Sequence, residues 1–270
     1  MRKKDFNIDE VKFKYVVKRE SITRIAKQLN TSRLTLRKWM VENDFKIESS
    51  RKHTNEIITL SKEQEDALFG GLLGDACLTN NGKEKNNAQI SYTSSCKDHV
   101  EFFKEFFEPN VSDYGVKESK YLDKRTNKVY TRYCYRSELN SRFSEYREKW
   151  YIDNIKTIPK DLKLTSKMCL IWYLGDGSLQ QCYNEKRTDL IKLSTNSFVQ
   201  EEVDNILVPQ LKKFGAYSAL NEKGQCIIRI PRKGINKFLS YIGECPVDSY
   251  KYKWEVFDYK YKKYKENEII

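Results

Sequence analysis

The chain has 270 residues and carries 50 Lys and Arg against 38 Asp and Glu, so its formal charge is +12 and its pI is about 9.2. This excess of positive charge favours a polyanionic partner. The longest apolar run, Met168–Leu174, is too short to span a bilayer, and seven Cys without a CxxC pair argue against a disulfide scaffold or a structural zinc site. We therefore expect a cytoplasmic protein with no membrane partner.

Residues 1–60 are the most basic part of the chain, with 15 Lys and Arg against 8 Asp and Glu. Within them, Ser21–Asn30 starts with a capping residue and repeats apolar residues at helical spacing, which predicts a short helix. A second helix is predicted over Arg33–Asn43, where Leu36, Trp39 and Met40 share one face. Its outward side chains are basic or polar: Arg33, Thr35, Arg37 and Lys38.

Two short amphipathic helices joined by a tight turn resemble the helix-turn-helix of bacterial DNA-binding proteins. The resemblance implies that residues 1–47 form a small all-α helix-turn-helix DNA-binding domain, in which the four outward side chains of the second helix contact DNA. The alternative is an ordinary helical packing module whose charged face is merely solvated. Residues 48–61 lack periodicity and are predicted to be a linker.

A longer pattern occurs twice after the linker. An apolar helix ends in Gly-Asp at residues 74–75 and again at residues 175–176. In both copies a strand-like run, an amphipathic helix, alternating strands and a further helix follow in the same order. We interpret the copies as a tandem duplication of an αββαββα unit, with pseudo-symmetric halves at 62–163 and 164–270, the second ending in a basic aromatic tail. The predicted fold class is therefore α+β.

Three glycines in the first apolar helix, Gly70, Gly71 and Gly74, predict that the two apolar helices approach closely. A Gly inside a helix costs about 1 kcal/mol relative to Ala, so several of them in one helix need a compensating contact. If the copies pack about a pseudo-twofold axis, Gly74 and Gly175 let the backbones touch, and Asp75 and Asp176 emerge side by side. Because two adjacent carboxylates repel unless a cation lies between them, we expect a divalent metal with oxygen ligands, Mg²⁺.

The two Gly-Asp motifs are similar to the paired LAGLIDADG motifs of single-chain, two-motif homing endonucleases. Segments in the right order behind them strengthen the likeness: Lys156–Leu162, Leu193–Phe198 and Pro246–Lys251. The sequence departs from the family motif at Leu73 and Leu174, where an earlier acid is replaced, and at Ala76, where the final glycine is replaced.

This resemblance implies roles for specific residues. The acids Asp75 and Asp176 would bind the catalytic metal, with Gly74 and Gly175 beside them in the metal site. A lysine near the end of each half would lie by the scissile phosphate, and these lysines are Lys156 and Lys251.

Each half should also form a four-stranded antiparallel sheet, and the two sheets should form a saddle for double-stranded DNA with a long asymmetric target, bound by a monomer. Strand periodicity places every second residue on that surface. The residues expected to contact DNA from the sheets and their loops are Lys83, Lys85, Gln89, Ser91, Arg132, Arg136, Lys186, Arg187, Lys192, Ser194 and Arg229.

The sequence thus predicts a site-specific, Mg²⁺-dependent DNA endonuclease, intron- or phage-encoded, that cuts both strands. Two other functions stay open. One is a non-catalytic DNA-binding transcriptional regulator, against which the retention of both acids argues. The other is an RNA maturase, whose partner would be the host intron RNA.

Overall fold

The computed structural model describes residues 6–17, 20, 22–45, 58–81, 84–108, 111, 113–181 and 190–256. The chain divides into two units, Met1–His53 and Thr54–Ile270. Ile58 and Leu60 already pack against the core of the second unit, and the Ile58 carbonyl accepts a hydrogen bond from Arg142 Nε at 3.3 Å. The second unit therefore starts before Ser61, where the sequence placed the end of the linker. Among the described helices, none has the length and apolar character needed to cross a membrane.

The first unit is helical and has a core of its own. The side chain of Ser32 caps its last helix by accepting a hydrogen bond from the Thr35 amide at 3.0 Å. Ile25 and Ala26 are buried with Leu36 and Met40, as the helical periodicity predicted. The elements are α1 (Ile8–Lys12), the π-helical turn η1 (Phe13–Val17), α2 (Ile22–Gln28) and α3 (Arg33–Glu42).

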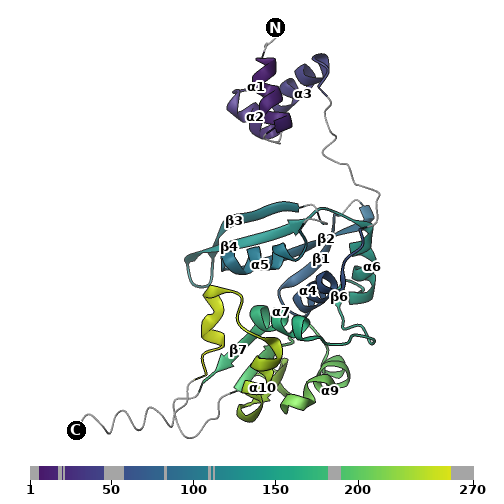
Figure 1. Ribbon diagram of the computed structural model, residues 1–270, viewed down its shortest axis with the longest axis vertical. Helices are drawn as coiled ribbons and strands as arrows, with labels where there is room; N and C mark the ends of the chain where they lie inside the picture. Colours follow the sequence, from purple (N-terminus) through teal and green to yellow (C-terminus); the bar gives the residue numbers. More distant parts are fainter. Residues whose placement is uncertain are drawn as a thin grey trace, which may run out of the picture. The chain divides into compact units, whose positions relative to one another are not determined.

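The second unit contains the duplicated αββαββα pattern, which confirms the predicted fold class (Figure 1). Its first half forms an antiparallel sheet in the order β1-β2-β4-β3. The elements are α4 (Lys62–Leu73), β1 (Ala76–Asn81), β2 (Glu84–Ser94), α5 (Lys97–Glu105), β3 (Asp113–Asp123), β4 (Lys128–Ser137) and α6 (Ser141–Trp150), followed by the short pair β5 (Tyr151–Ile152) and β6 (Ile155–Lys156).

The second half repeats this topology with an antiparallel sheet in the order β7-β8-β10-β9. A contiguous helical stretch of four short pieces takes the place that α5 has in the first half. The elements are α7 (Ser166–Asp176), β7 (Gly177–Gln180), β8 (Leu190–Ser194), α8 (Gln200–Glu202), η2 (Val203–Leu207), α9 (Val208–Leu211), η3 (Lys212–Phe214), β9 (Tyr217–Leu220), β10 (Cys226–Pro231), α10 (Arg232–Ile242) and the 3₁₀-helix η4 (Asp248–Lys253).

One hydrophobic core runs through both halves of the second unit, and the helices α4 and α7 pack against each other at its centre. α4 starts with a capping box, in which Ser61 and Gln64 exchange hydrogen bonds between side chain and backbone. Thr165 caps the start of α7, because its side chain accepts a hydrogen bond from the Met168 amide. The apolar and almost entirely buried parts of the two helices are Ala67–Leu73 of α4 and Met168–Leu174 of α7, so each helix depends on burial between the two halves.

Candidate functional site

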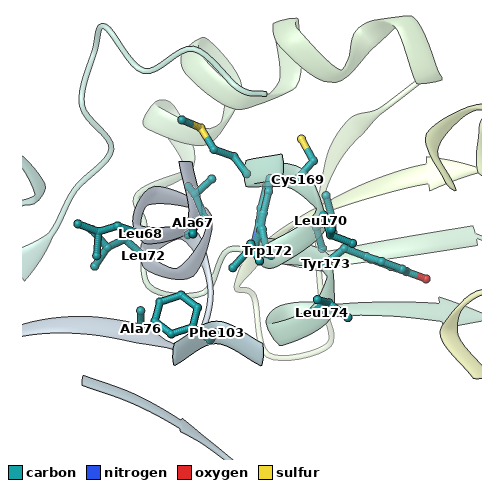
Figure 2. Packing of buried hydrophobic residues seen from close by; sticks show 14 of the residues in the cluster. Ala67, Leu68, Leu72, Ala76, Phe103, Cys169, Leu170, Trp172, Tyr173 and Leu174 are labelled. Atoms are coloured by element: carbon teal, nitrogen blue, oxygen red, sulfur yellow. The ribbon is translucent and has the colours of Figure 1, made fainter. Parts of the chain in front are cut away.

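The two central helices approach closely because a glycine lies at their contact. A Cβ atom built on Gly70 of α4 would lie 2.6 Å from the carbonyl oxygen of Met168 in α7. Only hydrogen fits at that distance. The helices therefore approach closely as the sequence predicted, but their tightest backbone contact lies at Gly70 and not at Gly74 and Gly175. Around this contact, Leu68 and Leu72 of α4 and Trp172 of α7 fill the core (Figure 2).

The helix ends then bring the two acidic residues together. Asp75 lies in the turn after α4, and Asp176 is the last residue of α7. The ends lie side by side, because a Cβ atom built on Gly175 would lie 3.0 Å from Asp75 Oδ2, and one built on Gly74 would lie 3.7 Å from the Asp176 amide. Gly175 therefore makes room for the Asp75 carboxylate, whereas a Cβ atom at Gly74 would make only ordinary van der Waals contacts.

The electrostatics of these carboxylates reflect their crowding. Burial, together with the charge of Asp75, raises the pKa of Asp176 to about 6. Asp75 reaches the surface, yet enough protein surrounds its carboxylate to raise its pKa as well, against the opposing charges of Lys253 and Lys156. Ionised carboxylates at this position are thus destabilised unless a cation joins them.

Two lysines complete the cluster, and the carbonyl groups at the helix ends hold them. Lys156 Nζ donates to the carbonyls of Ala76 at 2.9 Å and Gly74 at 3.3 Å. Lys253 Nζ donates in the same way to the carbonyls of Leu174 at 2.6 Å and Tyr173 at 3.3 Å. A helix C-terminus carries partial negative charge, which favours an ammonium group there.

Burial lowers the pKa of both ammonium groups to about 8, although the nearby charges of Asp75 and Asp176 act in the opposite direction. Each lysine therefore keeps its charge at neutral pH but is poorly hydrated. Such an ammonium group interacts more strongly with an incoming anion than an exposed lysine does.

The structure leaves Lys251, the lysine chosen from the sequence, outside this cluster. Its side chain is 63% exposed and pairs with Asp248 at 2.6 Å, whereas Lys253 is only 5% exposed. No sequence signal separates the two, because both belong to the same alternating run of Tyr and Lys. The structure thus brings Asp75, Asp176 and Lys156 together as expected and places Lys253 where Lys251 was expected.

The donor set at the helix ends fits a divalent metal of the Mg²⁺ kind. Among the described residues, no group of three or more His, Cys, Asp and Glu side chains could hold a metal ion. Mg²⁺ is usually held by one or two carboxylates while water and substrate phosphates fill its other positions. Asp75 and Asp176 offer such a pair, whereas the Gly74 carbonyl already accepts a hydrogen bond from Lys156.

The first sheet has a polar face opposite the core, which we call the open face of the sheet. Cross-strand pairing places Ser91 opposite Arg136 and Thr79 opposite Gln89, and the buried residues alternate with them. Arg132, four residues from Arg136 on the same strand, donates to Ser119 Oγ at 3.1 Å and lies over the ring of Tyr121. All four first-sheet residues chosen from the sequence thus share one face.

The second sheet has an equivalent open face. Lys192 pairs with both Ser178 and Arg229 across the neighbouring strands, and Ser194 lies on the same face two residues further along. Lys192, Ser194 and Arg229 are all partly exposed. Lys83, Lys186 and Arg187 lie outside the described residues, and so does the Lys85 side chain.

The first unit presents its predicted contact residues to solvent. Arg33, Thr35, Arg37 and Lys38 are all exposed on α3, while the other side of that helix is buried. Leu34 is 82% exposed on the same outer surface. The periodicity of this helix therefore placed its faces correctly.

Comparison with known proteins supplies a family. The model of the LAGLIDADG DNA endonuclease family matches residues 65–238 of this chain, which contain both acids and Lys156. The structure of the homing endonuclease I-WcaI bound to its DNA recognition sequence is similar with a TM-score of 0.68 and 21% identity, over 80% of this chain and 98% of that one. At this identity the likeness shows a shared fold.

The relatives found by sequence match this chain over only part of their length. An uncharacterized protein of Methanocaldococcus jannaschii is 32% identical over 53% of both chains. The cytochrome b mRNA maturase bI2 of Debaryomyces hansenii is 25% identical over 61% of this chain and 62% of its own length. The probable intron-encoded endonuclease 1 of Wickerhamomyces canadensis is 26% identical over 72% of this chain and 85% of its own length. The chain spans less than two thirds of the first two relatives.

Proposed function

Because this chain belongs to the LAGLIDADG DNA endonuclease family, we propose that it is a site-specific homing endonuclease that cuts both strands of duplex DNA with the help of a divalent metal, Mg²⁺. The observation that carries the proposal is the cluster of Asp75, Asp176, Lys156 and Lys253 at the ends of two closely packed helices. A non-catalytic DNA-binding protein would gain nothing from bringing these partly buried charges together.

Asp75 and Asp176 would hold the metal, which supplies an acidified water and stabilises charge on a phosphodiester in its transition state. Lys156 and Lys253 each use two of three N–H donors on helix-end carbonyls, so one N–H is left for a phosphate oxygen or for water. The carbonyls fix the direction of that N–H before DNA arrives, which lowers the cost of reorganisation during the reaction.

The open faces of the two sheets would bind the duplex. They carry Arg132, Arg136, Lys192 and Arg229, whose guanidinium and ammonium groups suit phosphates and guanine edges, and Gln89, which suits adenine. Two different sheets in one chain match an asymmetric target read by a monomer. The helix-turn-helix would add contacts outside the sheets and raise affinity.

The test uses the full chain and a supercoiled plasmid that carries the uninterrupted form of its host locus, with Mg²⁺ or with EDTA. We expect double-strand breaks at one position, with Mg²⁺ only. Asp75→Asn and Asp176→Asn should each abolish them, and Asp161→Asn, which changes an exposed aspartate, should not. Breaks at the wild-type rate in either of the first two variants would refute the metal assignment.

RNA maturation is a second candidate function, because one relative is named as an mRNA maturase. The same basic surfaces could bind a structured intron. A filter-binding titration with the host intron RNA, and with an unrelated RNA of equal length, tests whether the chain binds its intron specifically. Preference for the intron by at least about tenfold, or about 1.4 kcal/mol, would support maturase activity.

A further inference from the structure

Each lysine of the cluster belongs to a segment that is anchored on the opposite half of the second unit. Lys156 ends β6 in the first half, and the hydroxyl of the next residue, Thr157, donates to Glu202 Oε1 of α8 in the second half. Lys253 ends η4 in the second half. There the amide and the hydroxyl of Ser249 bond to the Asp98 carboxylate of α5 in the first half, at 3.0 and 2.9 Å.

The two anchoring carboxylates lie in corresponding helices of the duplication, Asp98 as the second residue of α5 and Glu202 as the third residue of α8. α5 follows β2 and α8 follows β8, and both acids lie in the first turn of their helices. The two anchors therefore form a reciprocal exchange across the pseudo-twofold axis. Asp98 also accepts a hydrogen bond from the His99 amide at 3.0 Å, and Glu202 Oε2 is buried without a hydrogen-bond partner among the described residues. Neither side chain belongs to the hydrophobic core.

Aromatic contacts strengthen the same exchange. The Lys156 ammonium lies over the ring of Phe198, 5.7 Å from its centroid, and Phe198 belongs to the second half. The Lys253 ammonium lies 4.3 Å from the centroid of Tyr250, whose hydroxyl bonds to Ser94 Oγ of the first half at 3.1 Å. Each ammonium group is thus oriented by its own helix end and by side chains that depend on the other half.

We propose that Asp98 and Glu202 are positioning residues that act across the two halves, Asp98 through η4 on Lys253 and Glu202 through Thr157 on Lys156. The position of each lysine then depends on both halves, on the carbonyls of its own half and on an anchor in the other, so cutting of the two strands is coupled through the fold. The inference about strand cutting rests on the proposed endonuclease function, whereas the inference about lysine position does not.

The position of the lysines can be measured without DNA. The full chain is acetylated with a limiting dose of acetic anhydride, and mass spectrometry gives the rate at each lysine relative to exposed lysines. Asp98→Ala should speed acetylation of Lys253 about tenfold, which corresponds to about 1.4 kcal/mol, and leave Lys156 unchanged. Glu202→Ala should do the reverse.

Conservative and control variants distinguish a specific effect on the position of one lysine from a general destabilisation of the fold. Glu202→Gln keeps an acceptor for Thr157 and should restore the slow rate at Lys156, and Ser249→Ala should give a weaker form of the Asp98→Ala effect. Glu105→Gln and Glu201→Gln remove exposed acids from the same helical segments and should change neither lysine. Equal acceleration of both lysines, or of neither, would overturn the proposal.

Strand-resolved cleavage is the second readout. A supercoiled plasmid with the host locus is cut by each variant, and the nicked intermediate is sequenced on both strands. Asp98→Ala and Glu202→Ala should each accumulate nicked circles. The nick made by one variant should lie on the strand opposite to the nick made by the other. Equal slowing of both strands would refute coupling through single lysines. If the wild-type chain cuts no DNA, the endonuclease proposal fails, while the acetylation pattern still decides the positioning.

Discussion

Gly70 of α4 lies directly against Met168 of α7, so closely that a Cβ atom on Gly70 would meet the Met168 carbonyl oxygen at 2.6 Å and its Cα at 2.9 Å. Both obstructing atoms are backbone atoms, which cannot turn away as the tip of a side chain can. This contact sets the spacing of the two helices whose ends carry Asp75 and Asp176. The stability of the second unit and the geometry of its site therefore depend on the same glycine.

Replacing Gly70 with alanine should destabilise the protein. Helix propensity alone would stabilise the variant by about 1 kcal/mol. The steric clash should outweigh that gain, because overpacking a tight core commonly costs about 1–3 kcal/mol and here no side chain can move aside. Urea unfolding of the two proteins measures the difference. A variant as stable as the wild type would mean that the helices can separate at no cost.

Asp176→Asn should stabilise the folded chain in EDTA while abolishing cleavage. Burial and the charge of Asp75 raise the pKa of Asp176 to about 6, so at pH 7 its ionised form is less favourable in the folded than in the unfolded state. A neutral amide removes that cost, and we expect a gain of about 1 kcal/mol. The measurement is urea unfolding with and without Mg²⁺, which should stabilise the wild type only. A less stable variant in EDTA would contradict the interpretation that burial and the charge of Asp75 destabilise the ionised form of Asp176.

Lys253 and Lys251 form a matched pair for the site. Lys253→Met removes an ammonium group that two helix-end carbonyls hold, and loss of such a preorganised group should slow cleavage about 10²-fold or more. Lys251→Met removes an equal charge two residues away and should leave the single-turnover rate nearly unchanged. Equal rates for both variants would place the catalytic lysine elsewhere.

This pair also shows where sequence reasoning stops. The duplicated pattern identified both acids and the order of all main elements, because helical and strand periodicity are local properties of the chain. The choice between Lys251 and Lys253 depends on the 3₁₀ turn of η4, in which residues two apart point in different directions. The anchors at Asp98 and Glu202 depend on contacts between distant segments, and no spacing rule in one sequence reveals them.

The linker also shows what sequence periodicity cannot reveal. Its lack of periodicity predicted an unstructured connection as far as residue 61, but Leu60 is buried in the core of the second unit. The few apolar residues at the end of this segment, which include Ile58 and Leu60, are too few to give a detectable period. Burial of such isolated residues becomes visible only when the surrounding helices are placed.

His99 should make stability depend on pH in the acidic range. It is 1% exposed, and its ring nitrogens contact Tyr92 Oη at 2.8 Å and Ser94 Oγ at 3.2 Å. Burial, with a smaller effect from Lys253, lowers its pKa to about 4, whereas the charge of Asp98 acts in the opposite direction. The unfolded chain takes up a proton near pH 6.5 and the folded chain does so only near pH 4, so stability falls as the pH drops through this interval, by on the order of 3 kcal/mol.

Comparison with His99→Gln isolates this effect, because carboxylate titrations are common to both proteins. Urea unfolding at pH 7.5, 6 and 5 should show the stability of the wild type falling relative to the variant as the pH is lowered. A constant difference across these pH values would show that His99 titrates alike in both states.

Arg37 of α3 should contribute to DNA affinity through the phosphate backbone. It is exposed on the outer surface of the capped helix, whereas Arg24 lies on α2 and forms a pair with Glu20 at 3.6 Å. Arg37→Ala and Arg24→Ala therefore remove the same charge from the same unit but from different helices. Anisotropy titrations of a non-specific duplex in EDTA at several salt concentrations should give a salt slope lowered by about 1 for Arg37→Ala only. Equal slopes for the two variants would show that the first unit acts through its net charge, without a defined contact helix.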